Sequence, residues 1–63
     1  MEYYVNKNSL NMSEACPEMT YYPKGDRFVL LNRYRAYVVI KHVVGGIIYE
    51  VPVVKFEKEF MGL

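Results

Sequence analysis

The sequence predicts an all-β domain, a small antiparallel sheet or partly open barrel of four to five strands with a central Gly-Gly hairpin. Residues 43–48 place Gly45 and Gly46 between two apolar runs rich in β-branched side chains. Apolar and polar residues alternate on both sides of these glycines, as expected for half-buried strands. A chain of 63 residues has room for only one hydrophobic core. We therefore expect residues 1–63 to form a single small β domain.

The first third of the chain is predicted to contain one strand and a loop. Residues 2–5 are rich in tyrosine and valine, which favour a short strand. The asparagines and serine that follow favour turns, because their side chains bond to nearby backbone groups. Asn11 could cap one helical turn with Glu14 as its capping-box partner, but Pro17 prevents any extension. We expect a loop or a single helical turn around residues 7–18.

Two more strands are expected before the hairpin, with a turn between them. Residues 19–22 are a strand candidate, and residues 23–26 carry proline and glycine at positions that favour a tight turn. Residues 27–31 would form the next strand. A helix over residues 27–34 is the alternative, because Asp26 could cap it and three apolar side chains share the spacing of one helical face. The turn before this segment and the β-branched residues after it favour the strand.

The register of the hairpin follows from its two glycines. A two-residue primed turn needs positive φ at both central positions, which glycine adopts without a steric clash. Residues 32–33 would turn the chain into a long strand over residues 34–44, and residues 47–54 would return antiparallel to it. This register places Lys41 opposite Glu50 as an attractive pair.

The register also divides the hairpin into two faces. The expected core face holds Ala36, Val38, Ile40, His42, Val44, Ile47, Tyr49, Val51, Val53 and Lys55. The other face carries the charged pair at its centre and is apolar at one end, a composition that suits a partner. Pro52 cannot donate a hydrogen bond to a neighbouring strand, so it should lie at a sheet edge or a bulge. Phe56 and Phe60 have the spacing of one or two helical turns whose apolar side docks on the domain.

Composition excludes several classes of protein. Cys16 is the only cysteine and His42 the only histidine, so neither a disulfide within the chain nor a zinc site is expected. The sequence has no apolar signal region at its start and no long uncharged apolar run, which indicates a cytoplasmic protein without a membrane span. A hydrophobic fraction of 52% in so short a chain suggests that another subunit or partner covers part of the apolar surface.

The polar residues do not have the spacing of a catalytic site. His42 has no acidic residue or cysteine close to it in sequence that would orient it as a base. Cys16 would need a basic neighbour to become a reactive thiolate. Glu57 and Glu59 lie beside lysines, as expected for a solvated surface. We therefore expect no enzyme activity, no cofactor and no metal.

Arginine and tyrosine gather in the middle of the chain. The net charge is +1, yet residues 21–42 carry five basic residues and one acidic residue, a sum of +4. The side chains expected to anchor a partner are Arg33, Tyr34, Arg35, Tyr37 and Phe56. The same mixture can stack unpaired bases and hold their phosphates, although its charge is well below that of a dedicated nucleic-acid binder.

The stretch before and within the hairpin resembles a known superfold. Residues 24–31, followed by residues 36–40 and a glycine hairpin, resemble the opening of Src-homology-three-like small β-barrels, whose first strand often follows a Gly-Asp turn. The resemblance implies a binding module without chemistry of its own. The sequence thus predicts a non-enzymatic protein-binding module, a small accessory subunit or inhibitor of phage type that occupies a partner protein's surface or forms a homo-oligomer. A single-stranded nucleic-acid binder that uses the same basic, tyrosine-rich face is the alternative.

Overall fold

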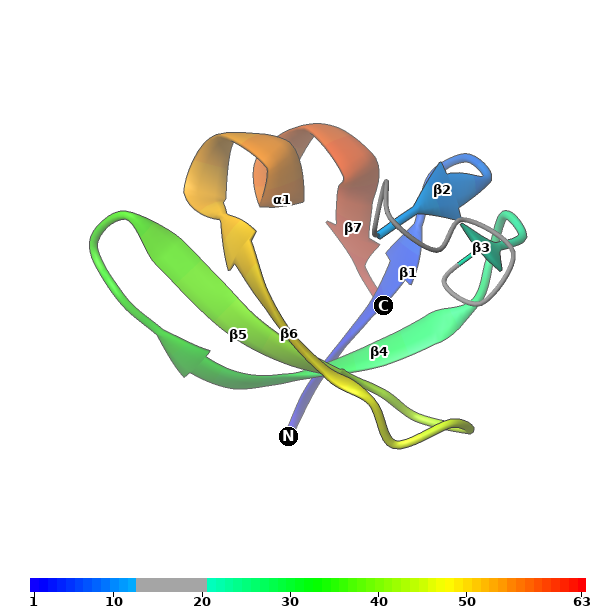
Figure 1. Ribbon diagram of the computed structural model, residues 1–63, viewed down its shortest axis with the longest axis horizontal. Helices are drawn as coiled ribbons and strands as arrows, with labels where there is room; N and C mark the ends of the chain where they lie inside the picture. The colour runs from blue at the N-terminus through cyan, green and yellow to red at the C-terminus, as the bar shows by residue number, and fades with distance from the viewer. Residues whose placement is uncertain (13–20) are drawn as a thin grey trace.

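The computed structural model describes residues 1–12 and 21–63 and confirms an all-β fold with one short helix. Its elements in chain order are β1 (Glu2–Asn6), β2 (Leu10–Asn11), β3 (Tyr21–Tyr22), β4 (Arg27–Arg33), β5 (Tyr37–His42), β6 (Ile48–Pro52), α1 (Val53–Glu59) and β7 (Phe60–Gly62). Five strands form one antiparallel sheet in the order β6-β5-β4-β1-β7, and β2 pairs with β3 in a second sheet. Because β6 and β7 are edges within the described part of the chain, the sheet is not a closed barrel (Figure 1).

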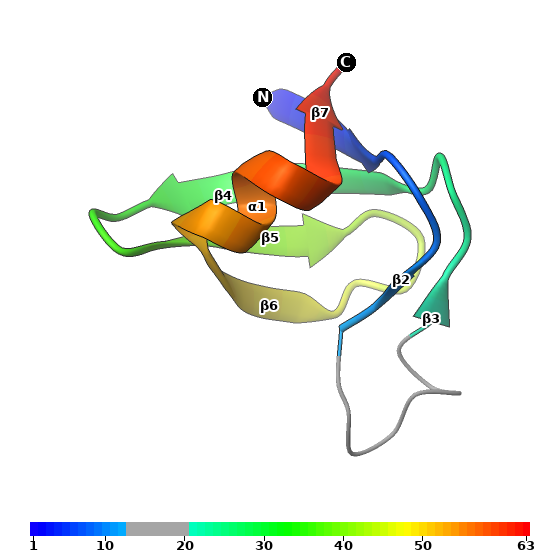
Figure 2. The same cartoon turned by 90° about the horizontal axis from the view of Figure 1, so that it is seen from above.

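The core lies on one side of the strongly twisted five-stranded sheet. Helix α1 and the β2–β3 pair both stand over this side, and Figure 2 shows α1 crossing in front of the sheet between its two edge strands, β6 and β7. The buried cluster consists of Leu10, Tyr22, Phe28, Val38, Ile40, Val51, Phe56 and Phe60. Its members come from β2 to β7, so every element except β1 contributes a buried side chain to this cluster.

The predicted core face of the hairpin is confirmed at its centre and wrong at its ends. Val38, Ile40 and Val51 are nearly inaccessible to solvent, and His42 is also buried. In contrast, 85% of Val44 is exposed because it lies in the loop beyond the last strand pairing. Ile47 is exposed as well, since it closes the same loop.

The predicted hairpin register is wrong by two residues. Glu50 lies opposite Val39, and Lys41 lies opposite Ile48. The connection is a four-residue loop over residues 43–46, closed by a hydrogen bond of 2.8 Å from the His42 backbone N–H to the Ile47 carbonyl oxygen. The wider loop keeps each side chain on its predicted face, because a shift of two residues preserves the alternation of a strand.

The conformation of the two glycines explains this correction. Only Gly46 has positive φ, +76°, whereas a two-residue primed turn of the predicted kind needs positive φ at both positions. The Gly45 backbone N–H instead donates a hydrogen bond of 2.9 Å to Nδ1 of the His42 ring. This contact holds Gly45 inside a wider loop.

Strand β4 is longer than predicted and carries an irregularity. The strand prediction for residues 27–31 is confirmed and the helix alternative is wrong, but β4 continues to Arg33 and the turn follows it at residues 34–36. The pairing of β4 with β5 shifts by one residue between Leu30 and Asn32, which is a β-bulge. Beyond the bulge Arg33 lies opposite Val38, a core residue, so its side chain is directed to the core side.

The remaining element predictions have mixed outcomes. The strand at residues 2–5 and the turn at residues 23–26 are confirmed, and Gly25 in that turn has a φ of +87°. The loop expected around residues 7–18 contains β2, which pairs with β3; the helical turn expected beyond Asn11 lies outside the described residues. Pro52 ends the edge strand β6, as predicted. The return strand predicted over residues 47–54 is too long, because α1 begins at Val53, and the helix expected around Phe56 and Phe60 ends at Glu59, so that Phe60 begins β7.

Candidate functional site

The turn between β4 and β5 brings together four of the five predicted anchors and rests on the fifth. The bulge in β4 turns Arg33 toward the core side, where its guanidinium carbon lies 5.8 Å from the centre of the Phe56 ring. The Arg33 guanidinium also donates to the hydroxyl of Tyr4 at 3.4 Å. Tyr4 in turn packs edge-on against Phe56 with 4.8 Å between ring centres. Contacts from two other elements, β1 and α1, therefore hold the arginine of β4.

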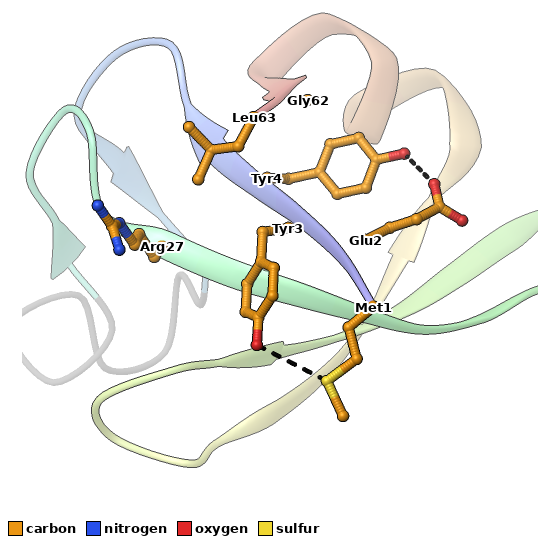
Figure 3. Close-up of a pocket in the computed structure, with 7 residues that line it drawn as sticks. All are labelled: Met1, Glu2, Tyr3, Tyr4, Arg27, Gly62 and Leu63. Carbon is orange, nitrogen blue, oxygen red and sulfur yellow. Dashed lines mark hydrogen bonds between the residues drawn. The ribbon is translucent and has the colours of Figure 1, made fainter.

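Tyr4 links the arginine to an acidic residue. Its hydroxyl donates a hydrogen bond of 2.8 Å to Oε1 of Glu2, drawn as a dashed line in Figure 3. This hydrogen bond, together with burial, raises the pKa of Tyr4 above its ordinary value, because ionisation would place a second negative charge beside the carboxylate. The Tyr4 hydroxyl thus bridges the Glu2 carboxylate and the Arg33 guanidinium.

Two stacked tyrosines, one exposed and one half-buried, lie at the turn. The rings of Tyr34 and Tyr37 stack with 4.9 Å between their centres and 28° between their planes. The Tyr34 backbone N–H donates to the Tyr37 carbonyl oxygen at 2.9 Å, and the Asn32 side chain donates to the Tyr34 hydroxyl at 2.8 Å. Nevertheless, 46% of Tyr34 remains exposed. The Val53 N–H donates to the Ala36 carbonyl oxygen at 3.0 Å and ties the turn to the start of α1.

Phe56 supports this turn from the core and does not contact solvent freely. Only 4% of it is exposed, because α1 curls over the sheet and carries Phe56 inward beside Phe60. Arg33, Tyr34 and Arg35 are exposed, and Tyr37 is half-buried. Sequence reasoning missed the supporting roles of Tyr4 and Asn32; the pairing of β1 with β4 and the bulge in β4 create both.

The face of the five-stranded sheet that points away from α1 is a second feature, which we call the outer face. The strand pairings align Tyr3, Val29, Lys41 and Ile48 in one row across it, and Val39 and Glu50 occupy the next row. Large apolar side chains remain exposed here: 42% of Tyr3 and 58% of Ile48 are accessible to solvent.

A hollow opens beside β1 near both chain ends, between side chains from the two faces of the sheet (Figure 3). It has a volume of about 430 Å³ and is lined by Met1, Glu2, Tyr3, Tyr4, Arg27, Gly62 and Leu63. Arg27 and Glu2 are its two charged side chains. The hollow has no cluster of groups that would act together on a substrate.

The buried histidine has an acidic partner that sequence reasoning missed. Nε2 of His42 lies 3.0 Å from Oδ2 of Asp26, sixteen positions earlier in the chain, because the turn before β4 packs beside the end of β5. Since Nδ1 accepts the Gly45 N–H, the ring is the tautomer that donates from Nε2 to Asp26. Both ring nitrogens are therefore occupied by the fold, and neither is available to a substrate.

An adjacent pair of tyrosines completes this buried polar cluster. The hydroxyls of Tyr22 and Tyr49 share a hydrogen bond, and the Tyr22 ring lies 4.5 Å from the His42 ring. Burial, together with the bond to Tyr49, raises the pKa of Tyr22 well above its ordinary value. Within residues 1–12 and 21–63, no group of three or more His, Cys, Asp or Glu is arranged to hold a metal ion.

A comparison with protein-family models, curated proteins and solved structures found no significant match. In the part of the chain that the structure describes, no helix is both long and apolar enough to cross a membrane.

Proposed function

We propose that this chain is a non-enzymatic protein-binding module, an accessory subunit or inhibitor that occupies a partner's surface through the turn between β4 and β5. One observation carries the proposal: Tyr34 and Tyr37 are stacked on each other and partly exposed, and Tyr34 lies between Arg33 and Arg35 in the sequence. Tyrosine and arginine are the residue types that dominate the binding energy of protein interfaces.

Contacts already formed within the fold support this proposal. Binding normally costs about 0.5–1.5 kcal/mol for each flexible side chain that becomes ordered at an interface. Here Arg33 is already held by Tyr4 and Phe56, and the Tyr34 hydroxyl by Asn32. Part of the free-energy cost of ordering these side chains is therefore already included in the folding of the free protein.

The charge around the turn favours a protein over a nucleic acid. Glu2 lies close to Arg33 through the shared Tyr4 hydroxyl, so part of the positive potential at the turn is neutralised. A phosphate backbone would meet this carboxylate, whereas a protein partner can place an acidic group beside Arg35 and an apolar group on the tyrosines.

The stacked tyrosines also motivate the alternative function. An exposed tyrosine ring is a platform for an unpaired base, and base–aromatic stacking contributes about 1–3 kcal/mol per base. Two results together would establish this alternative and overturn the protein proposal. The chain would bind mixed-sequence single strands at low salt with an affinity that falls steeply as the salt concentration rises, and the dependence of affinity on salt would become weaker after Arg33→Ala and Arg35→Ala.

We also propose that the fold belongs to the Src-homology-three-like superfold. The residues that carry the resemblance, 24–31 and 36–40, form the turn before β4 together with parts of β4 and β5 in the central sheet.

The direct test of the function compares what matched variants capture from the native host. Wild type and a Tyr34→Ala, Tyr37→Ala double variant are immobilised at equal density, with Tyr21→Ala as the control. Tyr21 is 53% exposed on β3, away from the turn. We expect a protein retained by wild type and Tyr21→Ala and lost with the double variant. Equal capture by all three would show that the turn is not the binding surface.

A further inference from the structure

The outer face carries two charged side chains whose arrangement is suited to a second copy of the same chain. Lys41 on β5 and Glu50 on β6 both lie on this face, and both are exposed. Among the residues that the structure describes, neither forms an ion pair. Val39 and Ile48 lie opposite them and complete a square of four residues, two charged and two apolar, with like kinds on its diagonals.

The dimensions of a sheet define how two such squares can meet. Neighbouring strands are about 4.8 Å apart and alternate residues of a strand about 6.6 Å apart, so Lys41 and Glu50 are roughly 8 Å apart on their diagonal. A two-fold axis that lies between two packed outer faces and bisects this diagonal exchanges the positions of Lys41 and Glu50. Each lysine then meets the glutamate of the other copy.

The apolar diagonal fits the same axis. Val39 and Ile48 lie within about 20° of this axis, because the diagonals of a rectangle of about 4.8 by 6.6 Å cross at roughly 72°. Each of these side chains therefore meets its own counterpart, Val39 on Val39 and Ile48 on Ile48. The apolar contacts thus lie close to the axis, and one charge pair lies on each side of it at the same distance from the centre.

We infer that this chain forms a symmetric dimer through its outer face, with Lys41 of each copy paired to Glu50 of the other. The inference concerns a different surface from the β4–β5 turn and does not depend on the proposed function. Five strands of about five residues give the face a footprint of roughly 24 by 16 Å. Two such faces bury at most on the order of 800 Å² in total, less than the roughly 1,200 Å² of stable complexes, so the dimer should be weak and transient, with a dissociation constant on the order of tens to hundreds of micromolar.

The test exchanges the charges on one copy at a time and uses sedimentation velocity over a concentration series. Lys41→Glu places like charges opposite each other at two positions of the dimer, and so does Glu50→Lys. Each variant alone should dimerise at least about tenfold more weakly than wild type. An equimolar mixture of the two restores both attractive pairs, and should form a heterodimer with an affinity within about threefold of the wild-type dimer.

The mixture separates pairing between copies from pairing within one copy. If Lys41 and Glu50 interacted only within a chain, combining both changes in one chain would restore the interaction, but mixing two singly changed chains would not. Lys24→Glu and Glu57→Lys change the net charge equally at exposed sites away from the square, so each of these variants should dimerise like wild type. Circular dichroism of every variant checks that the fold is retained.

Three results would overturn the inference. The first is a wild-type chain that stays monomeric up to about millimolar concentration. The second is a dimer that is unaffected by Lys41→Glu and Glu50→Lys. The third is a mixture of the two single variants that remains monomeric although each variant is folded.

Discussion

The two glycines of the β5–β6 loop should tolerate alanine poorly, each for a different reason. Gly46 has a φ of +76°, a conformation that costs residues with a Cβ about 1–2 kcal/mol. A Cβ there would meet nothing closer than 4.0 Å, so the backbone conformation is the whole cost. At Gly45, where φ is not positive, a Cβ would lie 2.9 Å from Nδ1 of His42, a steric overlap that we expect to cost about 1–3 kcal/mol.

These two costs can be separated by changing His42. In His42 the γ carbon lies 4.0 Å from a Cβ at position 45, which is an ordinary contact, and only Nδ1, beyond it in the ring, overlaps. A valine side chain ends at its γ carbons, so His42→Val removes the overlap. The Gly45→Ala change should then be nearly neutral in the His42→Val background. Gly46→Ala should cost the same in both backgrounds, since its backbone strain does not involve the ring.

Thermal and urea unfolding of the six chains measure this double-mutant cycle. In a domain of this size, 1 kcal/mol lowers the melting temperature by roughly 4–8 °C, which is well resolved. Gly46→Ala with wild-type stability would refute the loop conformation. A Gly45→Ala cost that is unchanged in the His42→Val background would refute the contact between Gly45 and the histidine ring.

Three further predictions concern buried groups. The pKa of Tyr22 is raised in the folded state, so the stability that Tyr22 contributes is complete below its ordinary pKa of 10.0 and is lost as the pH rises from there toward the higher folded value. Unfolding measured at increasing alkaline pH should show this loss of stability. The variant Tyr22→Phe should show a smaller loss. Phe56→Ala should destabilise the fold by about 3–5 kcal/mol and loosen Arg33. Val54→Ala on the same helix, where 79% of Val54 is exposed, should change stability by less than about 0.5 kcal/mol. Equal effects of the two variants on unfolding in denaturant would contradict the buried position of Phe56. Asn6→Ala should cost about 2 kcal/mol or more, because the two N–H groups of the buried Asn6 amide are shared among the carbonyl oxygens of residues 8, 22 and 23. Stability like that of wild type would show that these bonds do not hold the β2–β3 pair.

Features that depend on local sequence could be predicted. The turn at residues 23–26 follows from its proline and from Gly25, which adopts the expected positive φ. The inward side chains of the hairpin follow from alternation, which a register change of two residues does not disturb. Pro52 marks a sheet edge because it has no N–H to donate.

Features that depend on contacts between distant residues could not be predicted. The width of the hairpin loop depends on the hydrogen bond between Gly45 and the His42 ring, and nothing in the glycine pair reveals a ring beside it. The bulge after Leu30 leaves no clear trace in the sequence, yet it decides that Arg33 faces the core side. Asp26 reaches His42 only through the packing of β4 on β5.

The central claim, that the β4–β5 turn is the protein-binding surface, is tested most directly by one affinity ratio. The dissociation constant of the captured partner is measured by calorimetry for Tyr37→Ala and for the control Tyr21→Ala. If Tyr37 is an anchor, its truncation should cost about 2 kcal/mol, which weakens binding roughly thirtyfold relative to the control. Equal dissociation constants for the two variants would contradict the claim.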